Sequence, residues 1–218
     1  MRDEDFECFI ETMGEATSRE KVPTATIDAY RGVLPDALLD IWENEGWCGY
    51  AKGLLWTVNP SDFDGLLQMW LRGTPFEKAD RYHIFARTAF GTLYAWGERY
   101  NRRVTIDCAY AHIVARHDRI TTPVENPNRM LLGFFGMSER EDYDMETESE
   151  GEWLFDQAVK KLGRLSSGQV YGFEPALAAG GRAQLSNLRR LRMDVHLAIL
   201  REFAEPTMPF QHVKLPDE

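Results

Sequence analysis

The sequence of 218 residues contains few cysteines and no long apolar segment. Its three cysteines, Cys8, Cys48 and Cys108, include no CxxC pair, so neither a disulfide framework nor a zinc knuckle is expected. No run reaches the roughly 18 apolar residues of a membrane span, and the acidic start MRDEDFECF is unlike a secretory signal. These absences predict a protein of the reducing cytoplasm that has no membrane segment.

Positive charge is also in deficit, because 25 lysines and arginines face 35 aspartates and glutamates, which gives a net charge of −10. A surplus of this sign disfavours direct binding to DNA, RNA or anionic lipid, and it favours a basic partner. Hydrophobic residues, at 44%, and aromatic residues, at 12%, nevertheless provide for a packed core. A chain of this length is expected to fold without a disulfide or a metal ion.

The common catalytic and cofactor motifs are missing as well. The sequence has no GxGxxG, GxxxxGK[ST], GxSxG or HExxH, so the usual phosphate-binding loops, nucleophile elbow and zinc helix are not expected. His112 and His117 are five residues apart, which places them on different faces of a helix and disfavours a shared metal ion. We therefore expect no enzyme activity, no cofactor and no metal site.

The hydrophobic pattern that is present predicts both helices and strands. Residues 49–60 indicate one strand or a hairpin, and residues 83–110, with their glycine and asparagine turns, indicate an antiparallel meander. Helical spacing of apolar residues indicates helices over residues 6–13, 35–46, 63–72, 153–162 and 185–199.

A polar run with two prolines and two asparagines, residues 119–130, separates the chain into two halves. We predict an α+β protein in which helices pack on antiparallel sheet meanders. Residues 1–118 form the first domain, and residues 119–218 form a smaller α+β domain with a long final helix.

Negative charge is concentrated in one stretch. Residues 139–152 contain eight acids and one arginine, a net charge of −7, whereas the other 204 residues together carry −3. Such a stretch is either a solvated loop or a surface that attracts a cation-rich partner, and it lacks the ligand spacing of a calcium loop. We predict that its acidic side chains bind the partner: Glu139, Glu141, Asp142, Asp144, Glu146, Glu148 and Glu150.

Several motifs resemble a known family. The stretches LPDALLDIWENEGWCGYAKGLLWTVNPSDF (34–63) and HIFARTAFGTLYAWGE (83–98) resemble the GAD-like domain of bacterial immunity proteins. The later stretches LLGFFGMSERED, WLFDQAVKKLGRLSSGQVYGFEPAL and VHLAIL are similar to the small domain that follows it in immunity proteins of type VI secretion systems.

This resemblance implies a cytoplasmic antidote that binds a co-encoded effector, typically a DNase, one to one, and blocks its active face or substrate groove. The family brings no catalytic motif and no residue-level binding positions. The role of the acidic stretch is therefore inferred from charge: a nuclease presents lysine and arginine to phosphates, and an anionic patch complements that surface.

Two alternatives remain open. One is a hydrolase that reverses a toxin's modification, with Cys108 as the nucleophile and His112 or His117 as the base. The other is a regulator that touches DNA through the basic cluster Arg189, Arg190 and Arg192. A small buried cysteine and a solvated helix face are the simpler interpretations of these residues.

Overall fold

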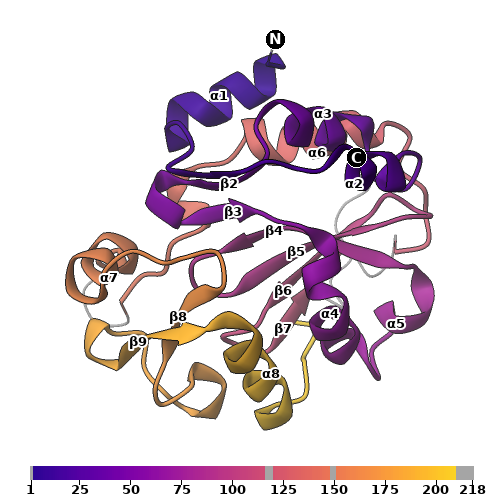
Figure 1. Cartoon of the computed structure of the whole chain (residues 1–218). Coiled ribbons are helices and arrows are strands. Elements are labelled where there is room, and N and C mark those ends of the chain that lie inside the picture. Colours follow the sequence, from indigo (N-terminus) through magenta and orange to yellow (C-terminus); the bar gives the residue numbers. More distant parts are fainter. Residues whose placement is uncertain (1, 116–119, 148–150, 210–218) are drawn as a thin grey trace.

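The computed structural model describes residues 2–115, 120–147 and 151–209 of the chain. Its centre is a seven-stranded antiparallel sheet whose strands lie in chain order (Figure 1). Gly91, at φ +87°, turns the fourth strand into the fifth, and Asn101, at φ +53°, lies in the next turn. The strands are β1 (Ser18–Glu20), β2 (Trp47–Tyr50), β3 (Leu55–Thr57), β4 (Tyr82–Thr88), β5 (Thr92–Gly97), β6 (Arg103–Asp107) and β7 (His112–Val114).

Both faces of the sheet are buried. In β5, Leu93 and Ala95 point into one hydrophobic core, whereas Tyr94 and Trp96 point into the other. This alternation follows from the two-residue period of a strand, and it requires a layer of helices on each side.

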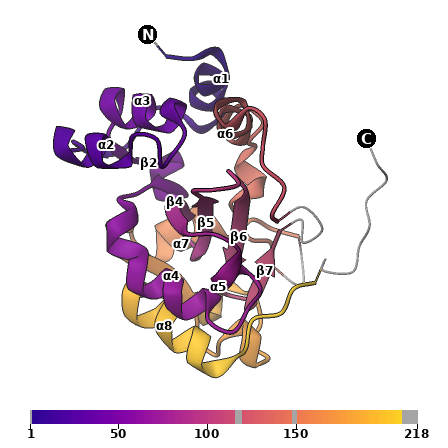
Figure 2. The same ribbon diagram turned by 90° about the vertical axis from the view of Figure 1, so that its right-hand side faces the viewer.

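The first face is covered by α1 (Glu4–Met13), α3 (Asp36–Asn44) and α6 (Pro127–Gly136), with α2 (Thr24–Tyr30) beside α3 (Figure 2). The Asp3 side chain accepts a hydrogen bond from the Asp5 backbone N–H at 3.0 Å and so caps the start of α1. Phe6 and Phe9 then pack edge-on against Phe135 of α6, with ring centroids 5.3 and 5.2 Å apart. A helix from the second half of the chain thus completes the core under the first helix.

The second face is covered by α4 (Asp64–Leu71) and α8 (Met193–Phe203), with the short α5 (Phe76–Ala79) beside α4 (Figure 2). Trp70 Nε1 donates to the Leu197 carbonyl at 3.2 Å. Arg201, which is 5% exposed, donates to the carbonyls of Met69 and Arg72, both at 3.1 Å. These carbonyls end α4 without a helical partner, so Arg201 satisfies them and fixes α8 against α4.

The C-terminal half also contains α7 (Leu154–Leu162) and a second sheet, in which β8 (Gln169–Phe173) pairs antiparallel with β9 (Leu188–Arg192). Two hydrogen bonds join β8 and the loop before it to β4 and the residue that follows β4. The Tyr171 N–H donates to the Ala89 carbonyl at 2.9 Å, and Arg87 Nη2 donates to the Ser167 carbonyl at 2.7 Å.

The long final helix predicted over residues 185–199 is wrong in its first half. Residues Leu185–Asn187 form a 3₁₀ turn, residues 188–192 form β9, and the helix begins only at Met193. Leucines at positions 185, 188 and 191 suit a helix by spacing alone, but β8 offers five backbone partners in register. Strand pairing outweighs the local pattern here.

The α+β class, with helices packed on an antiparallel meander, is confirmed by this architecture. The boundary predicted between residues 118 and 119 falls on residues outside the described part of the chain. Within the part that is described, no helix has the length and apolar character that a membrane crossing requires.

Candidate functional site

The acidic stretch of residues 139–152, here called the acidic segment, follows α6. It contains the 3₁₀ turn Arg140–Asp142, in which the Asp142 carboxylate accepts from the Glu139 backbone N–H at 2.8 Å. Arg140 forms its ion pair with Asp156, at 3.0 Å. Glu148 and Glu150 lie outside the described residues. Four exposed acids form no ion pair with any described residue: Glu139, Glu141, Asp142 and Glu146.

Asp144 differs from its neighbours because it is part of the fold. Its Oδ1 accepts from the backbone N–H groups of Met145 at 2.7 Å and Phe155 at 2.8 Å. Phe155 lies in the first turn of α7, whose preceding residue supplies no side-chain cap, so Asp144 satisfies one of the free N–H groups there. Burial raises the pKa of this carboxyl above its usual value. Asp144 therefore fixes the segment against α7.

A second concentration of acids, which the sequence analysis missed, lies on the helices of the first face. Residues 2–13 and 36–45 contain nine carboxylates and one base, Arg2. We call the exposed members the acidic helical layer: Asp3, Glu4, Asp5, Glu7, Glu11, Asp36, Asp40 and Glu43.

The acidic helical layer and the acidic segment are neighbours in space. A side chain at Gly136, the last residue of α6, would lie 2.8 Å from Cβ of Asp5 in α1. The acidic segment begins three residues later, so it leaves α6 beside the start of α1. The two stretches of negative charge, far apart in the chain, therefore flank one end of α6.

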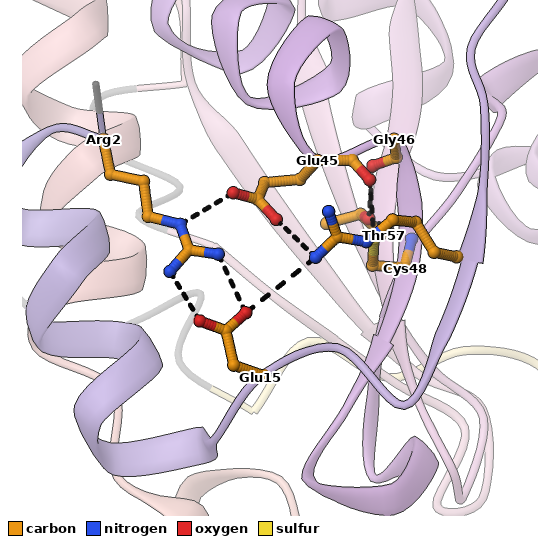
Figure 3. Close-up of polar contacts among 7 residues, drawn as sticks. Arg2, Glu15, Glu45, Gly46, Cys48 and Thr57 are labelled. Carbon is orange, nitrogen blue, oxygen red and sulfur yellow. Dashed lines mark hydrogen bonds and ion pairs between the residues drawn. The ribbon is translucent and has the colours of Figure 1, made fainter.

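Arg2, Arg19, Glu15 and Glu45 form an ion-pair network, which the contact of Arg19 with Glu15 at 3.9 Å closes (Figure 3). Arg2 Nε lies 2.7 Å from Glu45, and its two Nη atoms lie 2.7 and 2.8 Å from the two oxygens of Glu15. Arg19 lies 2.8 Å from the second oxygen of Glu45. These bonds raise the pKa of Arg2 and lower the pKa of Glu15, so the pairing favours the charged form of both side chains.

The network is held by the turn that joins α3 to β2. The Cys48 thiol donates to the Glu45 carbonyl at 3.1 Å, and Thr57 Oγ1 accepts from the Cys48 N–H at 2.8 Å (Figure 3). Glu45, whose side chain is 5% exposed, is consequently fixed in place with its two arginine partners.

A cavity of about 430 Å³ lies between α1, α3 and α6. Asn128 of α6 positions one of its walls, because its Oδ1 accepts from the Ala37 backbone N–H in the first turn of α3 at 3.1 Å. Pro35 precedes α3 and supplies no side-chain cap, so Asn128 takes that role from another helix. The lining is apolar at Phe6, Ala37, Ile41 and Leu132, and polar at Arg2, Asp3, Asp36, Asp40, Asn44, Glu45 and Asn128.

The geometry does not favour a nucleophilic cysteine. Cys108 is fully buried in the core beneath α4 and α8, and this burial, together with nearby Asp107, raises the pKa of its thiol. A buried thiol with a raised pKa holds little of the thiolate that attacks. The proposed base His112 instead stacks its ring on Tyr110 at 5.9 Å, and His117 lies outside the described residues.

The basic cluster is dispersed by the strand that carries it. Adjacent residues Arg189 and Arg190 of β9 point to opposite faces of their sheet. Arg189 lies 3.5 Å from Glu174, and Arg192 lies 2.7 Å from Asp194. Two of the three arginines thus have carboxylate partners, and no continuous basic stripe forms. The described residues also contain no group of three side chains placed to hold a metal ion.

Two family models match the chain. The GAD-like domain matches residues 4–110, and the T6SS immunity protein Tdi1 C-terminal domain matches residues 129–204. Among proteins of curated function, none matches.

Among solved structures, the crystal structure of Atu4351 from Agrobacterium tumefaciens is similar in fold. It is 22% identical in sequence, the match covers 91% of this chain and 89% of that chain, and the TM-score is 0.78. The two family matches lie on either side of residues 111–128 and together span most of the sequence. The chain therefore belongs to the GAD-like immunity proteins of type VI secretion systems.

Proposed function

We propose that this immunity protein binds a DNase effector one to one in the cytoplasm and covers its DNA-binding face with negative charge. The observation that carries the proposal is the placement of the acidic segment beside the acidic helical layer at one end of α6. A DNase must present lysine and arginine to phosphates, so the two surfaces have opposite potentials.

The proposed toxin-binding residues of the acidic segment are Glu139, Glu141, Asp142, Glu146, Glu148 and Glu150, together with Asp144 as the residue that holds the segment in place. Long-range attraction by such a surface raises association rates by about 10- to 1000-fold. Exposed ion pairs each contribute only about 0 to 1 kcal/mol, so tight binding also needs a desolvated contact. Inhibition then follows from occupation of the substrate groove, with no reaction on the immunity protein.

Inhibition and association together test this proposal. The effector encoded beside this chain is purified, and its cleavage of plasmid DNA is titrated with the immunity protein; we expect inhibition to be complete at a ratio of one to one. The double variant Glu139→Gln, Glu141→Gln should then associate several-fold more slowly at low salt and with a shallower salt dependence.

A control variant with the same change in net charge is Asp64→Asn, Glu202→Gln, whose positions lie on α4 and α8 across the sheet. Its association rate should match that of the unmodified protein. An effector that does not cleave DNA, or equal slowing in both variants, would contradict the proposal.

A further inference from the structure

The cavity between α1, α3 and α6 is lined by carboxylates that form no ion pair with a basic side chain of the described residues. Within the described part of the chain, Asp3, Asp36 and Asp40 form no ion pair, and the single base in the lining, Arg2, is already bound by Glu15 and Glu45. Asp3 contributes a cap to α1 through one oxygen, and Asp36 and Asp40 are exposed at the cavity mouth. The site therefore carries a negative charge that the fold itself does not balance.

The inner lining has a different character. Phe6 is 1% exposed and Ile41 is 6% exposed, and with Ala37 and Leu132 they provide the apolar part of the lining. A ligand that fills this space must combine an aliphatic or planar body with a positive end. A purely apolar ligand would remove the aspartates from water without compensation, and an anion would be repelled.

We infer that this cavity receives one basic side chain, an arginine or a lysine, from the effector. Such side chains place a hydrocarbon stem on apolar surface while the charged end reaches a carboxylate, and a guanidinium binds a carboxylate through two hydrogen bonds. The inference rests on the proposed function, which makes the partner cationic, and it names the contact that anchors that partner.

The rigid surroundings of the cavity suit this role. Asn128 holds α6 against α3, Phe135 packs on Phe6 and Phe9, and ion pairs to Arg2 and Arg19 hold Glu45, which also lines the cavity. A preformed site loses little conformational entropy when it is filled. A half-buried ion pair in it would slow dissociation, whereas the exposed carboxylates elsewhere would mainly speed association.

The test compares two variants with the same change in net charge. Asp36→Asn, Asp40→Asn removes the unpaired charge at the cavity mouth and keeps the size of each side chain. Glu11→Gln, Glu43→Gln removes the same charge from α1 and α3 at exposed positions that do not line the cavity. Thermal unfolding first shows that both variants fold like the unmodified protein. The association and dissociation rates of each variant are then measured on the immobilised effector that is encoded beside this chain.

We expect both variants to slow association to a similar extent, because both change the long-range field equally. The cavity variant should in addition dissociate roughly 10- to 100-fold faster, and the control variant should not. Equal dissociation rates for the two variants would overturn the cavity inference. If the unmodified protein neither binds nor inhibits the effector, the proposed function itself fails and the inference fails with it.

A double-mutant cycle identifies the partner residue. Each lysine and arginine on the effector's binding face is changed to alanine and combined with Asp36→Asn, Asp40→Asn. For one of these basic residues, the loss of affinity caused by the alanine change should be at least about fivefold smaller in the cavity variant than in the unmodified protein. Strictly additive losses for every basic residue would contradict insertion of a single side chain.

Discussion

At the turn between α3 and β2, Gly46 has a φ of +89°, and a Cβ there would lie 2.3 Å from the Glu20 carbonyl oxygen. Both the left-handed backbone and the contact with β1 exclude a side chain. We expect Gly46→Ala to lower the free energy of unfolding by about 3 kcal/mol, because the strain and the clash add. Urea unfolding followed by tryptophan fluorescence measures this loss.

Gly180 provides the matched control. Its φ is +85°, but no atom lies within 4 Å of the position that a Cβ would take. Gly180→Ala should therefore cost only about 1 kcal/mol, the strain of the left-handed conformation. Equal losses at the two positions would show that the contact with β1 is unimportant.

His196 of α8 makes the stability of the protein depend on pH. Its ring lies against the backbone of β8, since a Cβ on Gly172 would be 2.2 Å from Nε2. Burial lowers the pKa of His196, and nearby Glu174 opposes this shift. Below the unfolded pKa of 6.5 the unfolded chain therefore binds more protons at this site, so the free energy of unfolding falls as the pH drops.

We predict that His196→Gln reduces this loss. Urea unfolding at pH 7.5 and pH 5.5 should show a smaller difference for the variant than for the unmodified protein, because the other histidines are common to both. Parallel pH profiles for the two proteins would refute a contribution from His196.

Among the helices, α3 depends on a cap from another element. The Asn128 side chain satisfies the Ala37 N–H and joins α6 to α3. We expect Asn128→Ala to lower the free energy of unfolding by about 1 kcal/mol, since one N–H in the first turn of α3 loses its acceptor. Thermal and urea unfolding would show it. The exposed Asn44→Ala, whose side chain bonds only within α3, serves as the control and should change stability by less than about 0.5 kcal/mol.

Elements that depend on local signals were predictable, and those that depend on distant partners were not. Helix α1 ends at Met13, directly before Gly14, and α7 ends at Leu162, directly before Gly163, as the sequence predicts, because an apolar stripe and a glycine stop lie within one short segment. The spacing of apolar residues predicts a helix over residues 188–192, but these residues form a strand. A local pattern contains no information about their pairing with residues 169–173.

The candidate site shows the same limit on the scale of the whole molecule. Charge counted along the chain reveals residues 139–152, where eight acids follow one another closely. The carboxylates of α1 and α3 are separated by more than 20 residues, and α6, which completes the cavity, comes from the second half of the chain. The sequence contains the acids on the exposed sides of these two helices, but only the packing of the helices brings them together around one cavity.

Packing between the two halves also determines how the chain folds. Leu131 and Phe135 of α6 are fully buried under the first face of the sheet, and Leu197 of α8 is fully buried under the second. A fragment of residues 1–118 would therefore expose apolar surface on both faces of its sheet. We predict that this fragment, expressed alone, shows no cooperative urea transition, because neither face retains its cover.

Adding the missing half as a separate chain tests whether the loss of cooperative unfolding comes from the missing packing or from the shorter chain. Fragments 1–118 and 119–218, co-expressed, should copurify and recover a cooperative transition, because α6 and α8 regain the sheet between them. Leu131→Asp in the second fragment should abolish that recovery, since it places an unpaired charge in the core. The exposed Arg129→Asp, two positions earlier on α6, should not. If fragment 1–118 unfolds cooperatively without its partner, its core is self-sufficient and the two halves are independent domains in folding as well as in sequence.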